Sequence, residues 1–200
     1  MGANVELDIF LKKEGFFLQP ILSLFKKEGL YVSIQEIRIF DDWEYTNEVS
    51  VDASSIDLNT SNIFLEKFSL IHFNISNRWR CTLMTSLVEE SYIDLSFGFD
   101  TNDLLQRSEK SIDDYVAVFY SKVTDIIDDT SRKEEFKDRF MLACMGIEYS
   151  VHFNDNLMMM LNDDNGVKRW ILPKNVGRDI VLKNFVKEEK NNTLILTRFY

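Results

Sequence analysis

Three alternating residues, Glu148, Ser150 and His152, supply the residue types of a catalytic triad for acyl transfer. They alternate with apolar residues, so we expect them on one face of a strand. Side chains at i and i+2 of a strand stand roughly 6.5 to 7 Å apart and point in parallel. A nucleophile and its base must approach to about 3 Å, and no strained Gly-x-Ser-x-Gly turn surrounds Ser150. We therefore interpret these residues as a solvated strand face.

Metal and cofactor sites have little support in the sequence. His72 and His152 are the only histidines, and neither has a second His or Cys at the spacing of metal ligands. Residues 161–172 resemble a calcium loop in part, but Leu161 and Leu172 occupy the first and twelfth positions, which should be acidic. The seven glycines are scattered and form no phosphate-binding loop. We expect no metal and no cofactor.

The remaining candidate is an acidic segment, residues 41–57, that contains aromatic residues but no Lys or Arg. A run of charges is commonly a solvated, mobile loop. The functional interpretation is a recognition surface, in which two aromatic anchors bind a partner and carboxylates steer a basic one. Carboxylates can also occupy the phosphate-binding groove of a nuclease, because they bind the same Lys and Arg residues. The candidate partner-binding residues are Asp41, Asp42, Trp43, Glu44, Tyr45 and Glu48.

Composition limits the class of protein. The chain has 200 residues, 45% of them hydrophobic, with 16 Phe, 7 Tyr and 3 Trp, which is enough apolar area for a substantial core and excludes disorder of the whole chain. The formal net charge of -10 opposes general affinity for nucleic acid, because phosphate contacts need clustered Lys and Arg. Acidity also serves solubility alone. A basic protein is the partner that fits this charge.

The compartment follows from the cysteines and the apolar runs. Cys81 lies on the apolar face of a predicted strand and Cys144 on the apolar side of a predicted helix, so we expect both to be buried and reduced. The first residues lack the basic and apolar regions of a signal peptide. No apolar run approaches the roughly 20 residues that cross a bilayer. We expect a cytoplasmic protein without membrane segments.

Residues 68–100 carry the clearest structural pattern. Apolar residues such as Ile71, Phe73, Leu83 and Phe97 fall on odd positions in three successive runs, and most even positions are polar. This period of two predicts a three-stranded antiparallel meander with one buried face. Strands are also predicted at residues 5–11 and 31–40. The second changes its apolar phase, which predicts a β-bulge near Gln35 and Glu36.

Helices and further strands complete the prediction. We expect a short helix from about Pro20, a helical piece at residues 63–68, and an amphipathic helix from Ile112 that ends at Asp128 and Asp129. A second helix at residues 131–146 would complete an αα-hairpin, with Phe136, Phe140, Ala143 and Cys144 on one side and Gly146 at its end. Beyond it we expect a strand at 147–153, hairpin arms at 157–161 and 167–172, a helix at 179–189 and a strand at 193–199.

These elements predict an α+β fold: a mostly antiparallel β-sheet of six to eight strands with an αα-hairpin packed on one face. We expect one domain, residues 1–200, and any subdivision near residues 101–110, where a polar stretch joins the meander to the helix.

In size, acidity, cytoplasmic character and absence of catalytic motifs, the chain resembles the small acidic immunity proteins that bacteria make against their own toxins. This resemblance implies a non-catalytic inhibitor that binds a cognate toxin and blocks its active site or substrate groove. Two other classes stay open. One is an enzyme whose site is assembled from carboxylates distant in sequence. The other is a structural or oligomerisation module with an uncovered apolar face.

Overall fold

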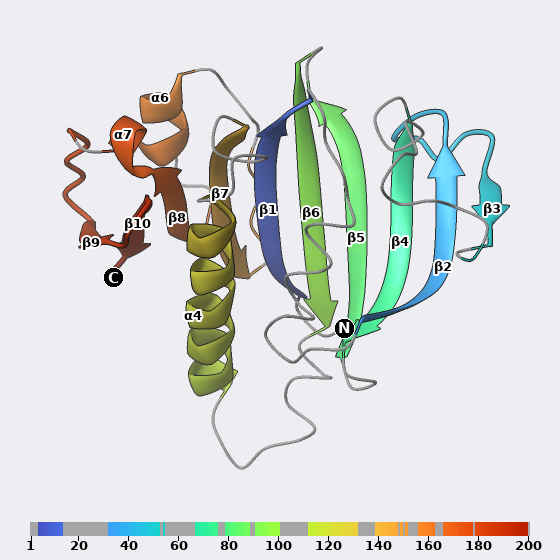
Figure 1. Cartoon of the computed structure of the whole chain (residues 1–200), viewed down its shortest axis with the longest axis horizontal. Helices are drawn as coiled ribbons and strands as arrows, with labels where there is room; N and C mark the ends of the chain where they lie inside the picture. The colour runs from blue at the N-terminus through green and yellow to red at the C-terminus, as the bar shows by residue number, and fades with distance from the viewer. Residues whose placement is uncertain are drawn as a thin grey trace.

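The computed structural model describes residues 4–13, 32–52, 54, 67–75, 79–88, 91–100, 112–131, 139–147, 149, 151, 156–162, 166–177 and 179–199. In this part of the chain, ten strands form one antiparallel sheet in the order β3-β2-β4-β5-β6-β1-β7-β8-β10-β9 (Figure 1). The strands are β1 (Asn4–Lys12), β2 (Val32–Phe40), β3 (Val49–Val51), β4 (Phe68–Ile75), β5 (Trp79–Val88), β6 (Tyr92–Asp100), β7 (Phe140–Ile147), β8 (Val167–Pro173), β9 (Phe185–Glu189) and β10 (Thr193–Arg198). The helices are α4 (Ile112–Ser131), α6 (Leu157–Asn162) and α7 (Lys174–Gly177).

The predicted meander is confirmed as β4, β5 and β6, which pair in sequence order. Their odd-numbered residues from Ser69 to Phe73, Cys81 to Thr85 and Ile93 to Phe99 are buried, and Leu87, near the end of β5, is the exception with 44% exposed. The period-two pattern therefore identifies the inner face of the sheet. β1, β2 and β10 also confirm predicted strands. The bulge in β2 is confirmed by the register shift between Ile34 and Glu36. The prediction of six to eight strands is too low, because β3 and β9 are short edge strands with weak patterns.

The predicted second helix is wrong over its C-terminal half, because residues 140–147 form strand β7 between β1 and β8. Most of this strand is buried on both faces. The sequence of a strand that is covered on both faces is a nearly continuous apolar run. Such a run also has apolar residues three and four positions apart, which is the pattern of an amphipathic helix. Gly146 does not end a helix: a Cβ atom there would lie 2.5 Å from Cδ1 of Tyr149. In the described part of the chain α4 is the one helix longer than six residues, so the αα-hairpin is a wrong prediction there.

Other C-terminal predictions need correction. Residues 157–162 are helix α6 and not a hairpin arm, because a five-residue apolar run rich in Met fits a short helix as well as a strand. The helix predicted at 179–189 is wrong, since β9 occupies its second half. β9 lies at the sheet edge and is exposed over most of its length, so it lacks the alternation of a half-buried strand. The helix near Pro20, Phe136 and most of the helical piece at 63–68 lie outside the described residues.

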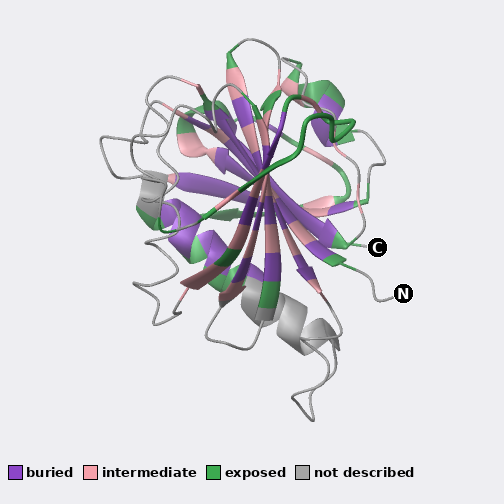
Figure 2. Cartoon of the chain, turned by 90° about the vertical axis from the view of Figure 1, so that its right-hand side faces the viewer, coloured by how far each residue is buried: buried purple, intermediate pink, exposed green. Residues whose placement is uncertain are grey.

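Two apolar clusters lie on opposite faces of the sheet. The larger one joins odd-numbered residues of the meander and β1 to the buried side of α4, including Val123 and Ile127. The smaller one lies on the other face of the C-terminal half, where Phe10 and Trp170 pack with Leu161 of α6. Viewed from the β3 edge, the strands fan out around a common centre and α4 turns buried surface toward them (Figure 2). This fan is the twist expected of a large sheet.

The remaining sheet surface is polar. On β1, β4, β5 and β6, and on β2 after its bulge, the even-numbered residues point to the face opposite α4, whereas Val32 and Ile34 before the bulge pack against the larger apolar cluster. Paired registers set His72 beside Thr82 and Thr82 beside Gly98. The same registers set Asp8 between Ser96 and Cys144. This surface, which we call the polar face, therefore brings together side chains from five strands.

Helix α4 continues past its predicted end at Asp128, and that residue binds the C-terminal hairpin. The Asp128 side chain is buried, and its Oδ1 atom accepts hydrogen bonds from the backbone N of Asn192 (3.0 Å), the backbone N of Thr193 (3.0 Å) and Oγ1 of Thr193 (2.7 Å). A carboxylate is unfavourable near the C-terminal end of a helix dipole. Here it is stabilised by hydrogen bonds from the turn between β9 and β10.

Candidate functional site

The six predicted partner-binding residues lie in the β2–β3 connection, residues 41–48, which we call the acidic loop. Its carboxylates form part of its own structure. Asp42 accepts hydrogen bonds from the backbone N of Glu44 (3.0 Å) and Thr46 (3.3 Å) and from Oγ1 of Thr46 (2.7 Å). These bonds, led by the one from the Thr46 hydroxyl, lower the pKa of Asp42. Asp42 therefore fixes the turn.

Asp41 anchors the same loop to the neighbouring strand. Its Oδ1 atom lies 2.7 Å from Nζ of Lys67, and its Oδ2 accepts a hydrogen bond of 2.7 Å from Nδ2 of Asn47. The Lys67 ammonium, followed by the Asn47 amide, lowers the pKa of Asp41. Two of the four carboxylates predicted to steer a partner, Asp41 and Asp42, are thus bound to groups of this protein.

Tyr45 holds the loop against the sheet. Its ring packs edge-on against Phe40 (centroids 5.0 Å apart) and Phe68 (5.6 Å), although 53% of the residue is exposed. Tyr45 and Asn47 have positive φ angles of 61° and 52°. Non-glycine residues adopt this conformation where surrounding contacts enforce it. The loop is therefore ordered by defined contacts, in contrast to the mobile loop that its charge suggests.

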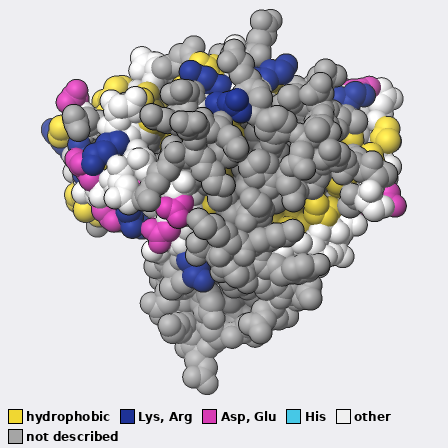
Figure 3. All heavy atoms as spheres, viewed as in Figure 1, with side chains coloured by type: hydrophobic (Ala, Val, Ile, Leu, Met, Phe, Trp, Pro, Cys, Tyr) yellow, Lys and Arg dark blue, Asp and Glu magenta, His cyan; other side chains and the backbone are white. Residues whose placement is uncertain are grey.

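Trp43, Glu44 and Glu48 are the loop residues that remain available to a partner. Trp43 is 74% exposed, the largest exposed fraction of any described aromatic residue. Glu44 and Glu48 are also exposed, and Glu48 lies 3.6 Å from the guanidinium of Arg38. Figure 3 shows hydrophobic and acidic side chains together on the right-hand edge, where Figure 1 places β3. The loop thus offers one large apolar group beside negative charge.

The polar face holds a carboxyl pair that spacing rules miss. Burial raises the pKa of Asp8, and burial together with the charge of Asp8 raises the pKa of Asp94 well above its usual value. Oδ1 of Asp94 is buried and has no hydrogen-bond partner in the described part of the chain. Two acids with raised pKa values are a feature of acid–base sites. Three hollows on the described surface are lined by other residues and include neither Asp8 nor Asp94.

Tyr149 connects this carboxyl pair to β7. Its hydroxyl accepts a hydrogen bond from the backbone N of Asp8 (3.0 Å) and donates one to the carbonyl oxygen of Cys144 (2.9 Å). Sγ of Cys144 lies 4.0 Å from Oδ2 of Asp8, and burial raises the pKa of this thiol well above its usual value. A thiol kept protonated is a weak nucleophile, so Cys144 is suited to packing.

The other sequence candidates contribute no site in the described residues. Glu148, Ser150 and His152 lie outside them. Nδ1 of His72 lies 3.2 Å from Oγ1 of Thr82, on the polar face. The described residues contain no group of three or more His, Cys, Asp or Glu side chains arranged to hold a metal ion. No described helix is long and apolar enough to cross a membrane.

Comparison with known proteins gives no family. No protein-family model matches the sequence, and no curated protein matches it significantly. The functional argument therefore depends on the geometry of the acidic loop and the polar face.

Proposed function

We propose that this protein is a non-catalytic protein-binding inhibitor that neutralises a basic partner, such as a cognate toxin, through the acidic loop. It would act in the cytoplasm, as the immunity proteins that it resembles do, and its two buried free cysteines are consistent with a reducing compartment. The observation that carries the proposal is Trp43, which is 74% exposed in a loop whose conformation is fixed by its own hydrogen bonds.

Trp43 is suited to be the anchor of the interface. Tryptophan is enriched among the few residues that dominate protein–protein binding, because its large ring fills a pocket on the partner at low entropic cost. Truncation of such a residue costs at least about 2 kcal/mol of binding free energy, which corresponds to a roughly 30-fold loss of affinity. An exposed tryptophan without a partner contributes little to folding, so binding is the simplest use for it.

The loop is also preorganised for binding. Asp41 and Asp42 hold its two ends, and Tyr45 packs on the sheet, so little conformational entropy remains to be lost when a partner binds. This divides the predicted site residues into two roles. Asp41, Asp42 and Tyr45 position the loop, and Trp43, Glu44 and Glu48 contact the partner.

Charge accounts for the class of partner. The formal net charge of -10 attracts basic proteins over a distance, and Glu44 and Glu48 place negative charge beside the anchor. We therefore expect the association rate to fall as salt screens these charges. The dissociation rate should depend mainly on Trp43.

The test is a pull-down of endogenous partners with the purified protein, followed by a binding measurement with the basic protein that it captures. Trp43→Ala should weaken binding at least about 30-fold. Met159→Ala, which shortens another side chain that is 62% exposed, is the matched control and should bind normally. Unchanged affinity of the Trp43→Ala variant would exclude the acidic loop as the binding surface.

A second candidate function, an enzyme with a carboxylate site, is supported by one observation: the raised pKa values of Asp8 and Asp94. Asp94→Asn distinguishes the two functions, because it removes a titrating carboxyl and leaves the acidic loop unchanged. An inhibitor should keep its affinity for the partner in this variant. Loss of a measured catalytic activity with unchanged partner binding would favour the enzyme.

A further inference from the structure

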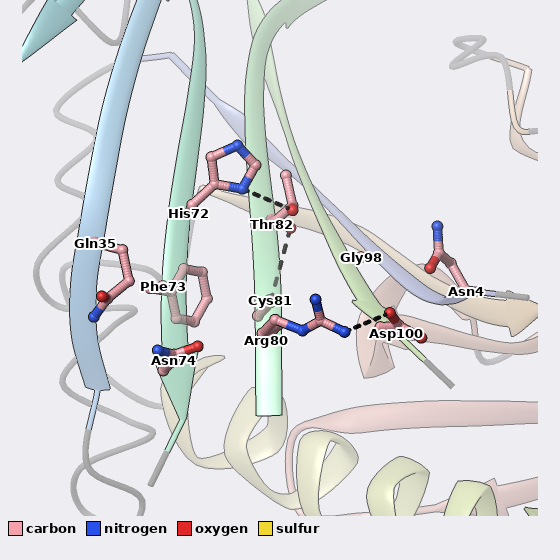
Figure 4. Close-up of a pocket in the computed structure, with 10 residues that line it drawn as sticks. All are labelled: Asn4, Gln35, His72, Phe73, Asn74, Arg80, Cys81, Thr82, Gly98 and Asp100. Atoms are coloured by element: carbon pink, nitrogen blue, oxygen red, sulfur yellow. Dashed lines mark hydrogen bonds and ion pairs between the residues drawn. The ribbon is translucent and has the colours of Figure 1, made fainter. Parts of the chain in front are cut away.

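A hollow of about 480 Å³ lies on the polar face, away from the acidic loop. Its volume is within the range of about 300 to 1,000 Å³ that is typical of small-molecule sites. Five strands contribute to it, and in Figure 4 Gly98 lies between the side chains of Thr82 and Asn4. The polar residues around the hollow are Asn4, Gln35, His72, Asn74, Arg80, Thr82 and Asp100.

Gly98 forms the floor of this hollow and has no structural reason to be glycine. It pairs with Thr82 of β5 and Glu6 of β1, within the interior of the sheet. Glycine weakens a strand because it has no side chain to pack and much conformational freedom to lose. A Cβ atom at Gly98 would have one neighbour within 4 Å, the carbonyl oxygen of Thr82 at 3.9 Å. A larger residue would thus fit.

The other described glycines differ from Gly98 in this respect. A Cβ atom at Gly146 would meet the ring of Tyr149 at 2.5 Å, and Gly166 has a φ angle of +78°. At Gly177 the added atom would come within contact of Leu194. In these three places the fold itself requires glycine, whereas at Gly98 the missing side chain leaves space on the open side of the sheet. Glycine inside a strand often marks close approach by a ligand.

The charges around the hollow compensate one another. Nη2 of Arg80 lies 3.1 Å from Oδ2 of Asp100, so the one cationic and the one anionic side chain of the lining form an ion pair. The hydrogen bond between His72 and Thr82 orients the imidazole ring. A bound anion would be repelled by Asp100 and a bound cation by Arg80. A neutral ligand therefore fits the charge of the site best.

The hydrogen-bonding groups that line the hollow are mainly on side chains. The amides of Asn4 and Asn74 have no side-chain hydrogen bond within the part of the chain that the structure describes. Each amide offers both donors and an acceptor, as a pair of neighbouring hydroxyl groups requires. The backbone groups of these central strands are used in the sheet, so a peptide main chain would find few partners.

We propose that the hollow over Gly98 binds a neutral, polyhydroxylated small molecule with the dimensions of a sugar ring. One face of the ring lies on the Cα atom of Gly98. Its hydroxyl groups exchange hydrogen bonds with Asn74, Arg80 and Asn4. The proposal is independent of the proposed function, because no residue of the acidic loop lines the hollow.

Titration of the full-length, isotope-labelled protein with glucose and with N-acetylglucosamine, followed by NMR, tests the proposal. Saturable shifts are expected at the backbone amides of His72, Thr82 and Gly98, with a dissociation constant on the order of 1 mM, because only a few side-chain hydrogen bonds are formed. Acetate and glycylglycine amide are the comparison probes for an anion and for a peptide. Both should bind more weakly than the sugars.

Gly98→Val supplies the decisive variant, because its branched side chain fills the floor of the hollow. It should weaken sugar binding at least tenfold while thermal stability stays equal or rises. Ser86→Val is the control: it places a valine on the same face of the sheet, on β5 and outside the hollow, and it should leave sugar binding unchanged. Gly98→Ala, whose added atom fits at 3.9 Å, repeats the test with a milder change. Absence of saturable shifts with both sugars, unchanged binding in the Gly98 variants, or tighter binding of acetate or glycylglycine amide would overturn the proposal.

Discussion

The carboxyl pair on the polar face predicts that the protein loses stability as the pH rises, and that Asp94→Asn removes much of this loss. Burial and the neighbouring Asp8 raise the pKa of Asp94 well above 3.8, and burial raises the pKa of Asp8. Between the unfolded and folded pKa values, the folded protein holds protons that the unfolded chain has released. The stabilising effect of these protons is complete below about pH 4 and is lost as the pH approaches the raised folded pKa values.

The magnitude follows from proton linkage. A carboxyl that binds one more proton in the folded state lowers the free energy of unfolding by about 1.4 kcal/mol for each pH unit in that interval. Asparagine keeps the shape of Asp94 without its charge, and it also removes the repulsion that acts on Asp8. We therefore expect Asp94→Asn to be more stable than the parent at pH 7, by about 1.4 kcal/mol for each pH unit by which the folded state raises the pKa of Asp94. At pH 4 the difference should disappear or reverse.

Urea unfolding followed by tryptophan fluorescence at several pH values between 4 and 8 measures this effect. The free energy of unfolding of the parent should fall with pH more steeply than that of the variant. Asp179→Asn, which neutralises an exposed carboxylate after α7, is the control and should follow the parent. Parallel curves for the parent and Asp94→Asn, or a variant that is less stable at pH 7, would refute the reasoning. The second result would mean that Asp94 is ionised and stabilised by a partner.

Three further predictions follow from single contacts. Asp128→Ala leaves the donors of Thr193 unsatisfied and should lower the free energy of unfolding by about 1 to 3 kcal/mol in urea titrations. Tyr149→Phe removes a hydroxyl group beside Asp8 that lowers the pKa of its carboxyl, so the fall of stability should extend to higher pH, which unfolding curves across the pH range would detect. Asp42→Ala should speed hydrogen exchange of the Thr46 amide and change global stability by less than about 0.5 kcal/mol.

The sequence predicts best those strands that are buried on one face. In β4, β5 and β6 the alternation of apolar and polar residues identifies each strand and its inner face, and the phase change in β2 identifies its bulge. The pattern fails where a strand has two similar faces. β7 is buried on both and was predicted as a helix, whereas β9 is exposed on both and was also predicted as a helix. A period of two requires two different environments, and neither strand has them.

Part of the acidic loop could also be predicted. The exposure of Trp43 and the acidity around it follow from composition. The use of Asp41 and Asp42 as structural groups does not, because it depends on Lys67, which precedes β4, and on the backbone of the turn itself. Carboxylate counts thus overestimated the number of carboxylates available to contact a partner. A run of acidic residues forms an ordered loop when their side chains accept hydrogen bonds from the backbone of the turn.

The pair of carboxyl groups, Asp8 and Asp94, could not be predicted from the sequence because of the sheet topology. β1 is the first strand of the chain, yet it lies between β6 and β7, so Asp8 reaches Asp94 through one ladder and Cys144, 136 residues away, through another. No spacing rule covers such distances. The same position makes β1 the strand that joins the meander to the C-terminal strands, because it forms both central ladders. Contacts this distant in sequence form slowly, because the entropy of loop closure opposes them, so we expect the polar face that contains Asp8 to be completed only when β1 pairs with β6 and β7.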